Sequence, residues 1–270
     1  MKHELGIIGA GNMAEAIARG LLGSGRMPAA AMIAADVSPQ RRELFQSQLG
    51  IATTADNAAA ASDCRILLLS VKPQQMSAAL ASIADVLNPS TLIISIAAGV
   101  TIQSIEKTLG PAHAWRIVRC MPNTPMLVGA GVVAIAAGKN AAPDDMAQTR
   151  RIFESAATVL ELSENKIDAV TALSGSGPAY FFYLAEEMIR AGVELGLTPD
   201  ESRRLVIATA AGAAKMLAES GESPAELRRK VTSPGGTTQA AITHMDENFW
   251  PQTTIDAVKA AARRSKELSS

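Results

Sequence analysis

One short segment in the C-terminal part of the chain combines residue types that hold a small anion. It reads Ser233-Pro234-Gly235-Gly236-Thr237-Thr238 and precedes a predicted helix from Gln239 to Met245. Adjacent glycines let the backbone turn tightly and approach a ligand, and the N–H groups at a helix start attract negative charge. The hydroxyl groups of Ser233, Thr237 and Thr238 add hydrogen bonds. The segment therefore predicts a site for a small carboxylate or phosphate.

A glycine-rich turn near residue 10 predicts a second site that holds an anion. The segment Gly9-Ala10-Gly11-Asn12-Met13-Ala14 follows an apolar run from Leu5 to Ile8 and opens a predicted helix from Met13 to Leu22. This is the G-x-G-x-x-G/A pattern between a strand and a helix. The first glycine permits the turn, the second leaves room for a pyrophosphate, and Ala14 lets the helix pack closely on the strand. We interpret the segment as a dinucleotide-binding turn, with an ordinary glycine turn as the alternative.

The end of the second predicted strand bears on the choice of cofactor. Asp36 follows the run from Met32 to Ala35, where an acidic residue binds the adenosine ribose and favours NADH. Ser38, Arg41 and Arg42 follow closely and are candidates to receive the 2′-phosphate of NADPH. Asp36 and Ser38 are equally well explained as caps of the next helix. The choice between NADH and NADPH stays open from the sequence.

Two further loops stand after strand-like runs. Ser70-Val71-Lys72-Pro73 follows the run from Ile66 to Leu69, and Ala97-Ala98-Gly99 follows the run from Leu92 to Ile96. Open α/β sheets bind ligands at the carboxyl ends of their strands. Each loop alone is equally consistent with a plain connection. Together with the glycine turn, the two loops predict the floor of a nicotinamide pocket.

The predicted secondary structure that positions these segments changes along the chain, from alternating strands and helices to helices alone. Apolar runs alternate with helical stretches at first, and Ile117-Val118 and Val132–Ile135 add two more candidate strands. This pattern predicts an α/β Rossmann domain with a mostly parallel sheet. Later the chain becomes entirely helical, and the sequences Thr198-Pro199-Asp200-Glu201 and Ser223-Pro224-Ala225-Glu226 predict capping boxes. We place the domains at residues 1–163 and 164–270.

Composition argues against several kinds of partner. The net charge is −1 and aromatic residues make up 3%, which disfavours nucleic acid. No apolar run is long enough for a membrane span, and His3, His113 and His244 show no metal-binding spacing. Cys64 and Cys120 form no disulfide framework. With no signal peptide seen in the sequence, we expect a cytoplasmic protein.

The motifs together resemble the pyrroline-5-carboxylate reductase family. The matching segments occur in the family's order and cover essentially the whole chain. They are Ile8–Met13, Ser70–Gln74, Arg119-Cys120-Met121-Pro122-Asn123-Thr124-Pro125, Leu173-Ser174-Gly175-Ser176-Gly177-Pro178-Ala179-Tyr180 and Val231–Thr238. The resemblance implies reduction of 1-pyrroline-5-carboxylate to L-proline with NADPH or NADH, the last step of proline synthesis. It also implies a helical C-terminal domain that associates into dimers, or into a pentamer of dimers.

The resemblance also implies roles for individual residues. The substrate carboxylate is expected on Ser233, Gly235, Gly236 and Thr237, with the ring nitrogen near Thr238 and with Glu164 close by. Ser176 is a weaker substrate candidate, because its glycine-rich surroundings also suit a close approach of helices. The predicted cofactor contacts are Ile8, Gly9, Ala10, Gly11, Asn12, Met13, Asp36, Ser38, Asn57, Ser70, Val71, Lys72, Pro73, Ala97, Ala98 and Gly99.

Two other functions remain as alternatives. A β-hydroxyacid dehydrogenase shares a similar glycine turn and a helical second domain, and it uses a lysine as catalytic acid. Lys166 and Lys215 are the only plausible candidates here, and neither stands in a matching motif. A nucleotide-sensing binding protein would need only the cofactor site, so it gives the Ser233–Thr238 segment no purpose.

Overall fold

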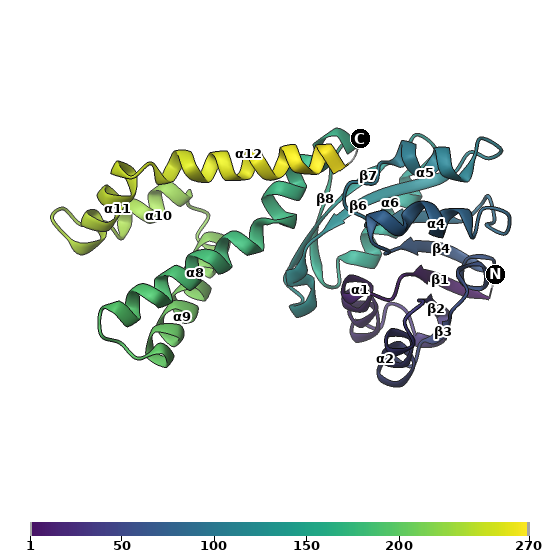
Figure 1. Cartoon of the computed structure of the whole chain (residues 1–270), viewed down its shortest axis with the longest axis horizontal. Coiled ribbons are helices and arrows are strands. Elements are labelled where there is room, and N and C mark those ends of the chain that lie inside the picture. Colours follow the sequence, from purple (N-terminus) through teal and green to yellow (C-terminus); the bar gives the residue numbers. More distant parts are fainter. Residues whose placement is uncertain (1, 269–270) are drawn as a thin grey trace. The chain divides into compact units, whose positions relative to one another are not determined.

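An eight-stranded sheet organises the N-terminal part of the chain (Figure 1). The computed structural model describes residues 2–268. The strands run in the order β3-β2-β1-β4-β5-β6-β7-β8, and neighbours are parallel except for the antiparallel pair β6 and β7. The predicted α/β class with a mostly parallel sheet is therefore confirmed. The strands are β1 (His3–Ile8), β2 (Met32–Ala35), β3 (Ala52–Thr54), β4 (Cys64–Leu69), β5 (Leu92–Ser95), β6 (Arg116–Pro122), β7 (Gly131–Ala137) and β8 (Ala157–Glu161).

Helices cover both faces of this sheet, which explains its continuous apolar strands. Leu5, Ile66 and Leu68 pack in one core with α1 (Asn12–Gly23), α2 (Pro39–Leu49) and α6 (Pro143–Phe153). Leu67 and Leu69 pack in a second core with α3 (Asn57–Ala61), α4 (Met76–Ala81) and α5 (Ile102–Leu109). Successive residues of a strand point to opposite faces, so both sets must be apolar. The carboxyl ends of β1 to β6 lie at one edge of the sheet, because these six strands are mutually parallel.

Several elements were not expected from the sequence. The strands β3 and β8 were missed because Ala52-Thr53-Thr54 and Ala157–Glu161 lie at the two edges of the sheet and lack an unbroken apolar run. The helix expected from Gln239 is α11 (Thr237–Glu247), so it begins two residues earlier. A single π-helical segment (Thr171–Gly175) follows α7 (Ile167–Val170) and the 3₁₀ turn Glu164–Lys166.

The chain divides into two compact units. One is Met1–Ser176 with Ala261–Ser270, and the other is Gly177–Ala260. Residues after 163 stay with the sheet because Ile167 packs on Ala134 and Ala136 of β7. The predicted boundary between residues 163 and 164 was drawn from the change in composition along the chain, and it stays a prediction.

The second unit is entirely helical. It contains α8 (Gly177–Glu194), α9 (Pro199–Glu219), α10 (Pro224–Lys230), α11 and the start of α12 (Trp250–Leu268). The capping boxes predicted at Thr198/Glu201 and Ser223/Glu226 both form. The helices α8 and α9 pack so closely that a Cβ on Gly192 would lie 2.5 Å from Ser202 Oγ.

Large apolar side chains of the helical unit face outward. Phe181, Phe182 and Phe249 are 72%, 68% and 74% exposed, and Val206 is the one buried hydrophobic residue of this unit among the described residues. A unit of this size normally buries a core of its own, and contiguous exposed apolar surface marks a contact site. The unit is therefore built to be covered by another protein surface.

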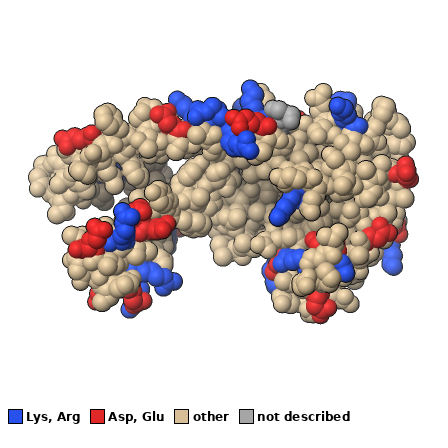
Figure 2. All heavy atoms as spheres, in the orientation of Figure 1, with Lys and Arg blue, Asp and Glu red and all other residues tan. Residues whose placement is uncertain are grey.

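The charged surface of the molecule is mixed in sign. On the face shown in Figure 2, Lys and Arg side chains stand beside Asp and Glu side chains. Ion pairs within single helices include Arg190–Glu187 and Arg204–Asp200. Within residues 2–268, none of the helices combines the length and the apolar character needed to cross a bilayer.

Candidate functional site

Gly9, the first glycine of the N-terminal turn, allows two loops to pack closely against each other. Gly9 has φ +93°, a conformation that L-residues rarely adopt. Its N–H donates to the carbonyl of Ala35 over 2.8 Å. A Cβ at this position would lie 2.8 Å from the carbonyl carbon of Ser70 and 2.9 Å from the nitrogen of Val71. Gly9 therefore brings the turn after β1 against the loop after β4.

The second glycine leaves an open helix start. Gly11 is the N-cap residue of α1, its backbone is extended, and no side chain caps the helix. A Cβ on Gly11 would meet nothing within 4 Å. Ala14 is completely buried, as close packing of α1 on the sheet requires. The first N–H groups of α1 consequently point into free space, which is the arrangement that binds a pyrophosphate.

The loops predicted to form the nicotinamide floor lie at the same edge of the sheet. The N–H of Ser70 donates to the carbonyl of Ile8, and the N–H of Ile96 donates to the carbonyl of Leu69. These bonds place the loops after β1, β4 and β5 side by side. Gly99 has φ +75°, and a Cβ there would lie 2.9 Å from the carbonyl oxygen of Leu268 near the end of α12.

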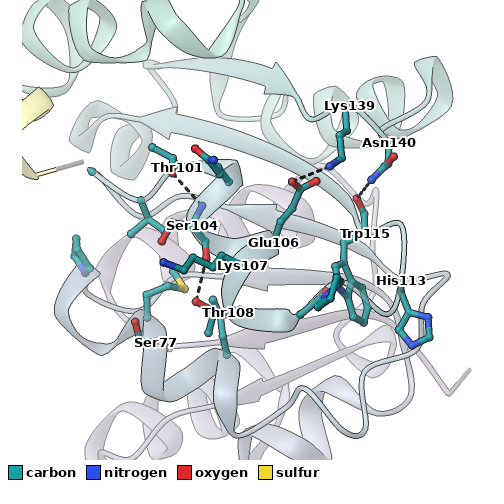
Figure 3. Close-up of a pocket in the computed structure, with 18 of the residues that line it drawn as sticks. Ser77, Thr101, Ser104, Glu106, Lys107, Thr108, His113, Trp115, Lys139 and Asn140 are labelled. Atoms are coloured by element: carbon teal, nitrogen blue, oxygen red, sulfur yellow. Dashed lines mark hydrogen bonds and ion pairs between the residues drawn. The ribbon is translucent and has the colours of Figure 1, made fainter. Parts of the chain in front are cut away.

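A large cavity begins at this floor and extends along α5 (Figure 3). It measures about 1240 Å³ and is lined by parts of α4 and α5, and by Ala98 and Gly99. Some of its labelled residues contact one another. Lys139 pairs with Glu106 over 3.3 Å, and Asn140 donates to the carbonyl of Trp115 over 3.3 Å. Pro73, Ala98 and Gly99 line this cavity and also belong to the predicted nicotinamide floor.

An ion pair between a buried arginine and a partly exposed glutamate lies at the start of α5. Arg119 of β6 is 4% exposed, and its Nη1 lies 3.1 Å from Glu164 Oε1. The same carboxylate oxygen accepts from the N–H of Ile102 over 2.8 Å. The Nη2 atom of Arg119 is buried without a hydrogen-bond partner in the described part of the chain. Glu164, predicted near the substrate, is thus engaged with the first residue of α5, and a substrate contact stays a prediction.

The π-helical segment presents Ser176 and is held by an asparagine. Asn123 is 7% exposed, donates through Nδ2 to the carbonyl of Ser174 and accepts through Oδ1 from the N–H of Val132. A Cβ on Gly175 would lie 2.6 Å from the methyl carbon of Met121. Single π-helical turns are frequent at functional sites. The segment is therefore a fixed feature, and the substrate role of Ser176 stays a prediction.

The hydroxyl-rich segment in the helical unit forms a compact turn onto α11. Gly235 has φ +71° and its N–H donates to Gln239 Oε1, while the N–H of Gly236 donates to the carbonyl of Ser233 over 3.0 Å. Gly236 is the N-cap residue of α11 without a side-chain cap. Thr237 and Thr238 are then the first two helical residues, so their N–H groups lack intrahelical partners. Ser233 and Thr237 are exposed and Thr238 is partly exposed, so the turn presents both N–H groups and hydroxyls to a ligand.

The two thiols are unsuited to chemistry. Burial raises the pKa of Cys64 to about 11 and raises the pKa of Cys120 well above its ordinary value. Both cysteines are free and buried. A thiol with a raised pKa holds little of the reactive thiolate at neutral pH. Among the described residues there is also no cluster of three or more metal-ligating side chains.

All predicted cofactor residues belong to the sheet unit, and the Ser233–Thr238 turn belongs to the helical unit. Two contributors were not assigned roles from the sequence. Arg119 is a charged residue within the otherwise apolar run Ile117–Cys120. A charged side chain in a buried strand needs a partner, so this pattern could have predicted an ion pair. Glu15 stands in the first turn of α1 and binds Arg41 over 2.8 Å, a contact between residues far apart in the sequence.

Comparison with protein families matches two parts of the chain. The family model described as pyrroline-5-carboxylate reductase dimerisation matches residues 164–268. The model described as NADP oxidoreductase coenzyme F420-dependent matches residues 4–99.

Full-length relatives and solved structures give a consistent result. The chain is 43% identical to the pyrroline-5-carboxylate reductase of Synechocystis sp. over 99% of both proteins, and 42% identical to that of Pseudomonas aeruginosa over 98% of this chain and 96% of the relative. The structure of a pyrroline-5-carboxylate reductase from Coxiella burnetii superposes with a TM-score of 0.90 at 38% identity. That of Plasmodium falciparum pyrroline carboxylate reductase with NADP bound gives 0.89 at 32%. Each structure covers 100% of both chains.

Proposed function

The chain belongs to the pyrroline-5-carboxylate reductase family, and from this membership we infer that it reduces 1-pyrroline-5-carboxylate to L-proline with NADH or NADPH. The observation that carries this function is the end-to-end similarity to relatives of that name, at 43% identity over 99% of both chains. Such similarity includes the dinucleotide turn and the hydroxyl-rich turn, the two anion sites that the reaction needs.

We propose that the cofactor lies at the carboxyl edge of the sheet. Bound NAD(P)H supplies the hydride. The open start of α1 at Gly11 to Met13 fits the pyrophosphate, because no side chain competes for its N–H groups. The adjacent loops at Ser70–Pro73 and Ala97–Gly99 hold the nicotinamide end, with Asn57 at the start of α3 as a further contact.

The substrate is held by its carboxylate on the turn before α11. Ser233 and Thr237 offer hydroxyl donors, and Thr237 also offers its N–H, to a negative oxygen that the helix dipole favours. The N–H groups of Gly235 and Gly236 are engaged by Gln239 Oε1 and by the carbonyl of Ser233, so these two glycines are proposed to contribute by letting the backbone come close to the carboxylate. Thr238 hydrogen-bonds the ring nitrogen and orients the C=N bond. A protonated imine is already electrophilic, so the protein chiefly needs to fix distance and face. The proton on nitrogen comes from water or from substrate protonated in solution, because the Thr238 hydroxyl is a poor acid.

Glu164 and Ser176 complete the proposed substrate surroundings. Glu164 holds Arg119 and Ile102 through Oε1, and about a third of its side chain is exposed, so its second oxygen can accept from a ligand. Ser176 follows the π-helical segment that Asn123 holds. We propose both as secondary contacts rather than as proton donors.

The family match includes a dimerisation region, and we propose that the exposed apolar helices of residues 177–260 form this interface. A pentamer of dimers is the larger assembly that we propose. A reducing compartment such as the cytoplasm suits two free, buried cysteines.

Replacement of Lys166 or Lys215 by glutamine is expected to leave turnover nearly unchanged. Lys215 is 72% exposed and reaches only Glu219, at 4.0 Å, and Lys166 is exposed in a short 3₁₀ turn. We expect kcat within about twofold of the unsubstituted protein, whereas loss of a true general acid costs about 10²- to 10⁴-fold. Steady-state kinetics on both variants would show a large loss if the chain instead worked as a lysine-dependent β-hydroxyacid dehydrogenase.

Absorbance of NADH and NADPH, followed side by side with 1-pyrroline-5-carboxylate, tests the proposed function. We expect oxidation that depends on both the substrate and the protein, with proline formed in equal amount. Cofactor binding without oxidation of either cofactor would contradict the proposal and favour a nucleotide-sensing protein.

A further inference from the structure

The acidic residue after β2 is fixed in place by backbone hydrogen bonds. Asp36 Oδ2 accepts from the N–H of Ala10 over 2.7 Å, and Oδ1 accepts from the N–H of Ser38 over 2.8 Å. The side chain is therefore tied to the glycine turn that fits the pyrophosphate. A carboxylate has about four lone-pair positions, so two acceptors remain for ribose hydroxyl groups. An acidic residue at this position of a Rossmann domain hydrogen-bonds the ribose 2′-hydroxyl of NADH.

The groups that would have to receive a 2′-phosphate are already engaged. Ser38 Oγ accepts from the N–H of Arg41 and caps α2. Arg42 Nη1 donates to the carbonyls of Asp36 and Val37 over 2.7 and 3.1 Å. Arg41 Nε donates to the carbonyl of Ala10, and its guanidinium lies over the ring of Phe45. A phosphate beside Asp36 would meet a carboxylate, and at these same nitrogen and oxygen atoms it would compete with contacts that already exist.

Glu15 forms an ion pair with Arg41, one of the two arginines near the end of β2. Its Oε2 lies 2.8 Å from Arg41 Nη2, and its Oε1 lies 2.9 Å from Arg19 Nε. The side chains of Glu15 and Arg41 are 16% and 24% exposed, so water screens this pair less than a surface pair. Although burial alone would raise it, hydrogen bonds from Arg19 and Arg41 lower the pKa of Glu15 below its ordinary value. Glu15 is therefore negatively charged at neutral pH.

We propose that Asp36 and Glu15 together make this chain prefer NADH over NADPH. Asp36 binds the ribose hydroxyls of NADH and repels a 2′-phosphate, while Glu15 keeps Arg41 in an ion pair so that it is not free to bind that phosphate. The inference rests on the proposed function, because it concerns the cofactor of the same site. The inference adds Glu15 of α1 to the residues that determine cofactor specificity, and Glu15 lies outside the loop after β2.

Dissociation constants of NADH and NADPH, measured by nicotinamide fluorescence on the full chain, test this inference. We expect NADH to bind at least about tenfold more tightly, the effect of one charge-assisted hydrogen bond. Glu15→Gln keeps the shape of the side chain and removes its charge. We expect this variant to bind NADPH about tenfold more tightly than the unsubstituted chain does, with the NADH constant unchanged.

Arg19→Gln is the matched control, since it removes the other partner of Glu15 and leaves the pair with Arg41 intact. Arg19→Gln should change neither the NADH nor the NADPH dissociation constant.

Asp36→Ser should weaken NADH binding and so reduce the difference between the two dissociation constants. This variant also removes the hydrogen bond to the N–H of Ala10, so Glu15→Gln is the decisive variant. Equal or tighter binding of NADPH by the unsubstituted chain, or an unchanged ratio in Glu15→Gln, would overturn the inference. Absence of turnover with both cofactors would contradict the proposed function instead, because the binding ratio is measured without substrate.

Discussion

Replacing Gly9 by alanine is expected to weaken binding of NAD(P)H by about 100-fold or more, because a misplacement of about 1 Å in a binding loop has effects of that size. The residue has φ +93°, and the added Cβ would lie 2.8 Å from the backbone of Ser70. Both the turn after β1 and the loop after β4 must move to accept it. A strained backbone of this kind also costs about 1–3 kcal/mol of stability, so thermal unfolding should occur at lower temperature.

Gly11→Ala separates cofactor binding from folding. Gly11 has φ −73°, which alanine adopts easily, and its Cβ would meet no atom of the described chain within 4 Å. We therefore expect normal thermal unfolding but weakened binding of NAD(P)H, because the methyl group enters the space assigned to the pyrophosphate. Gly23→Ala, at the far end of α1 and equally free of contacts, should change neither property. Cofactor binding by Gly11→Ala at the unsubstituted level would place the pyrophosphate elsewhere.

Replacing Thr238 by alanine is expected to lower kcat by about 100-fold, the effect of removing one hydrogen-bonding group aimed at a reacting centre. The hydroxyl is proposed to orient the ring nitrogen, which matters most while the hydride is transferred. Ser233→Ala is expected chiefly to raise KM, since Ser233 is proposed to bind the carboxylate equally in substrate and transition state. Steady-state kinetics with varied 1-pyrroline-5-carboxylate measure both parameters.

Thr238→Ser is the control for the Thr238 variant, because it keeps the hydroxyl and removes only a methyl group. It should recover most of the lost turnover. If Ser233→Ala instead lowered kcat and Thr238→Ala raised KM, the roles of the two hydroxyls would be reversed. If neither variant changed the kinetics, the turn before α11 would not be the substrate site.

The sequence predicted the parts of this fold whose residues repeat a pattern. Apolar runs such as Leu67–Leu69 identify buried strands because both of their faces need apolar side chains. The capping boxes at Thr198 and Ser223 were also predicted, since their donors and acceptors lie within three residues. Edge strand β3 was missed because Ala52-Thr53-Thr54 carries no such pattern and pairs with β2 only in the folded chain.

The parts of the candidate site that are formed by residues close together in the sequence could be predicted. Gly9 and Gly11 were identified from their spacing, and the structure gives each a distinct reason, a positive φ for one and free space for the other. The ion pairs Arg119–Glu164 and Arg41–Glu15 join residues on different elements. Periodicity and propensity carry no information on such pairs, so these contacts had to come from the three-dimensional structure.

Hydride transfer to the imine carbon is the central claim, and a labelled cofactor tests it most directly. The protein would be incubated with 1-pyrroline-5-carboxylate and NADH carrying deuterium at C4 of the nicotinamide, on the transferred face, and the product analysed by NMR and mass spectrometry. The account predicts L-proline with one deuterium at C5, the carbon of the former C=N bond. Cofactor oxidation without labelled proline, or no oxidation at all, would contradict it.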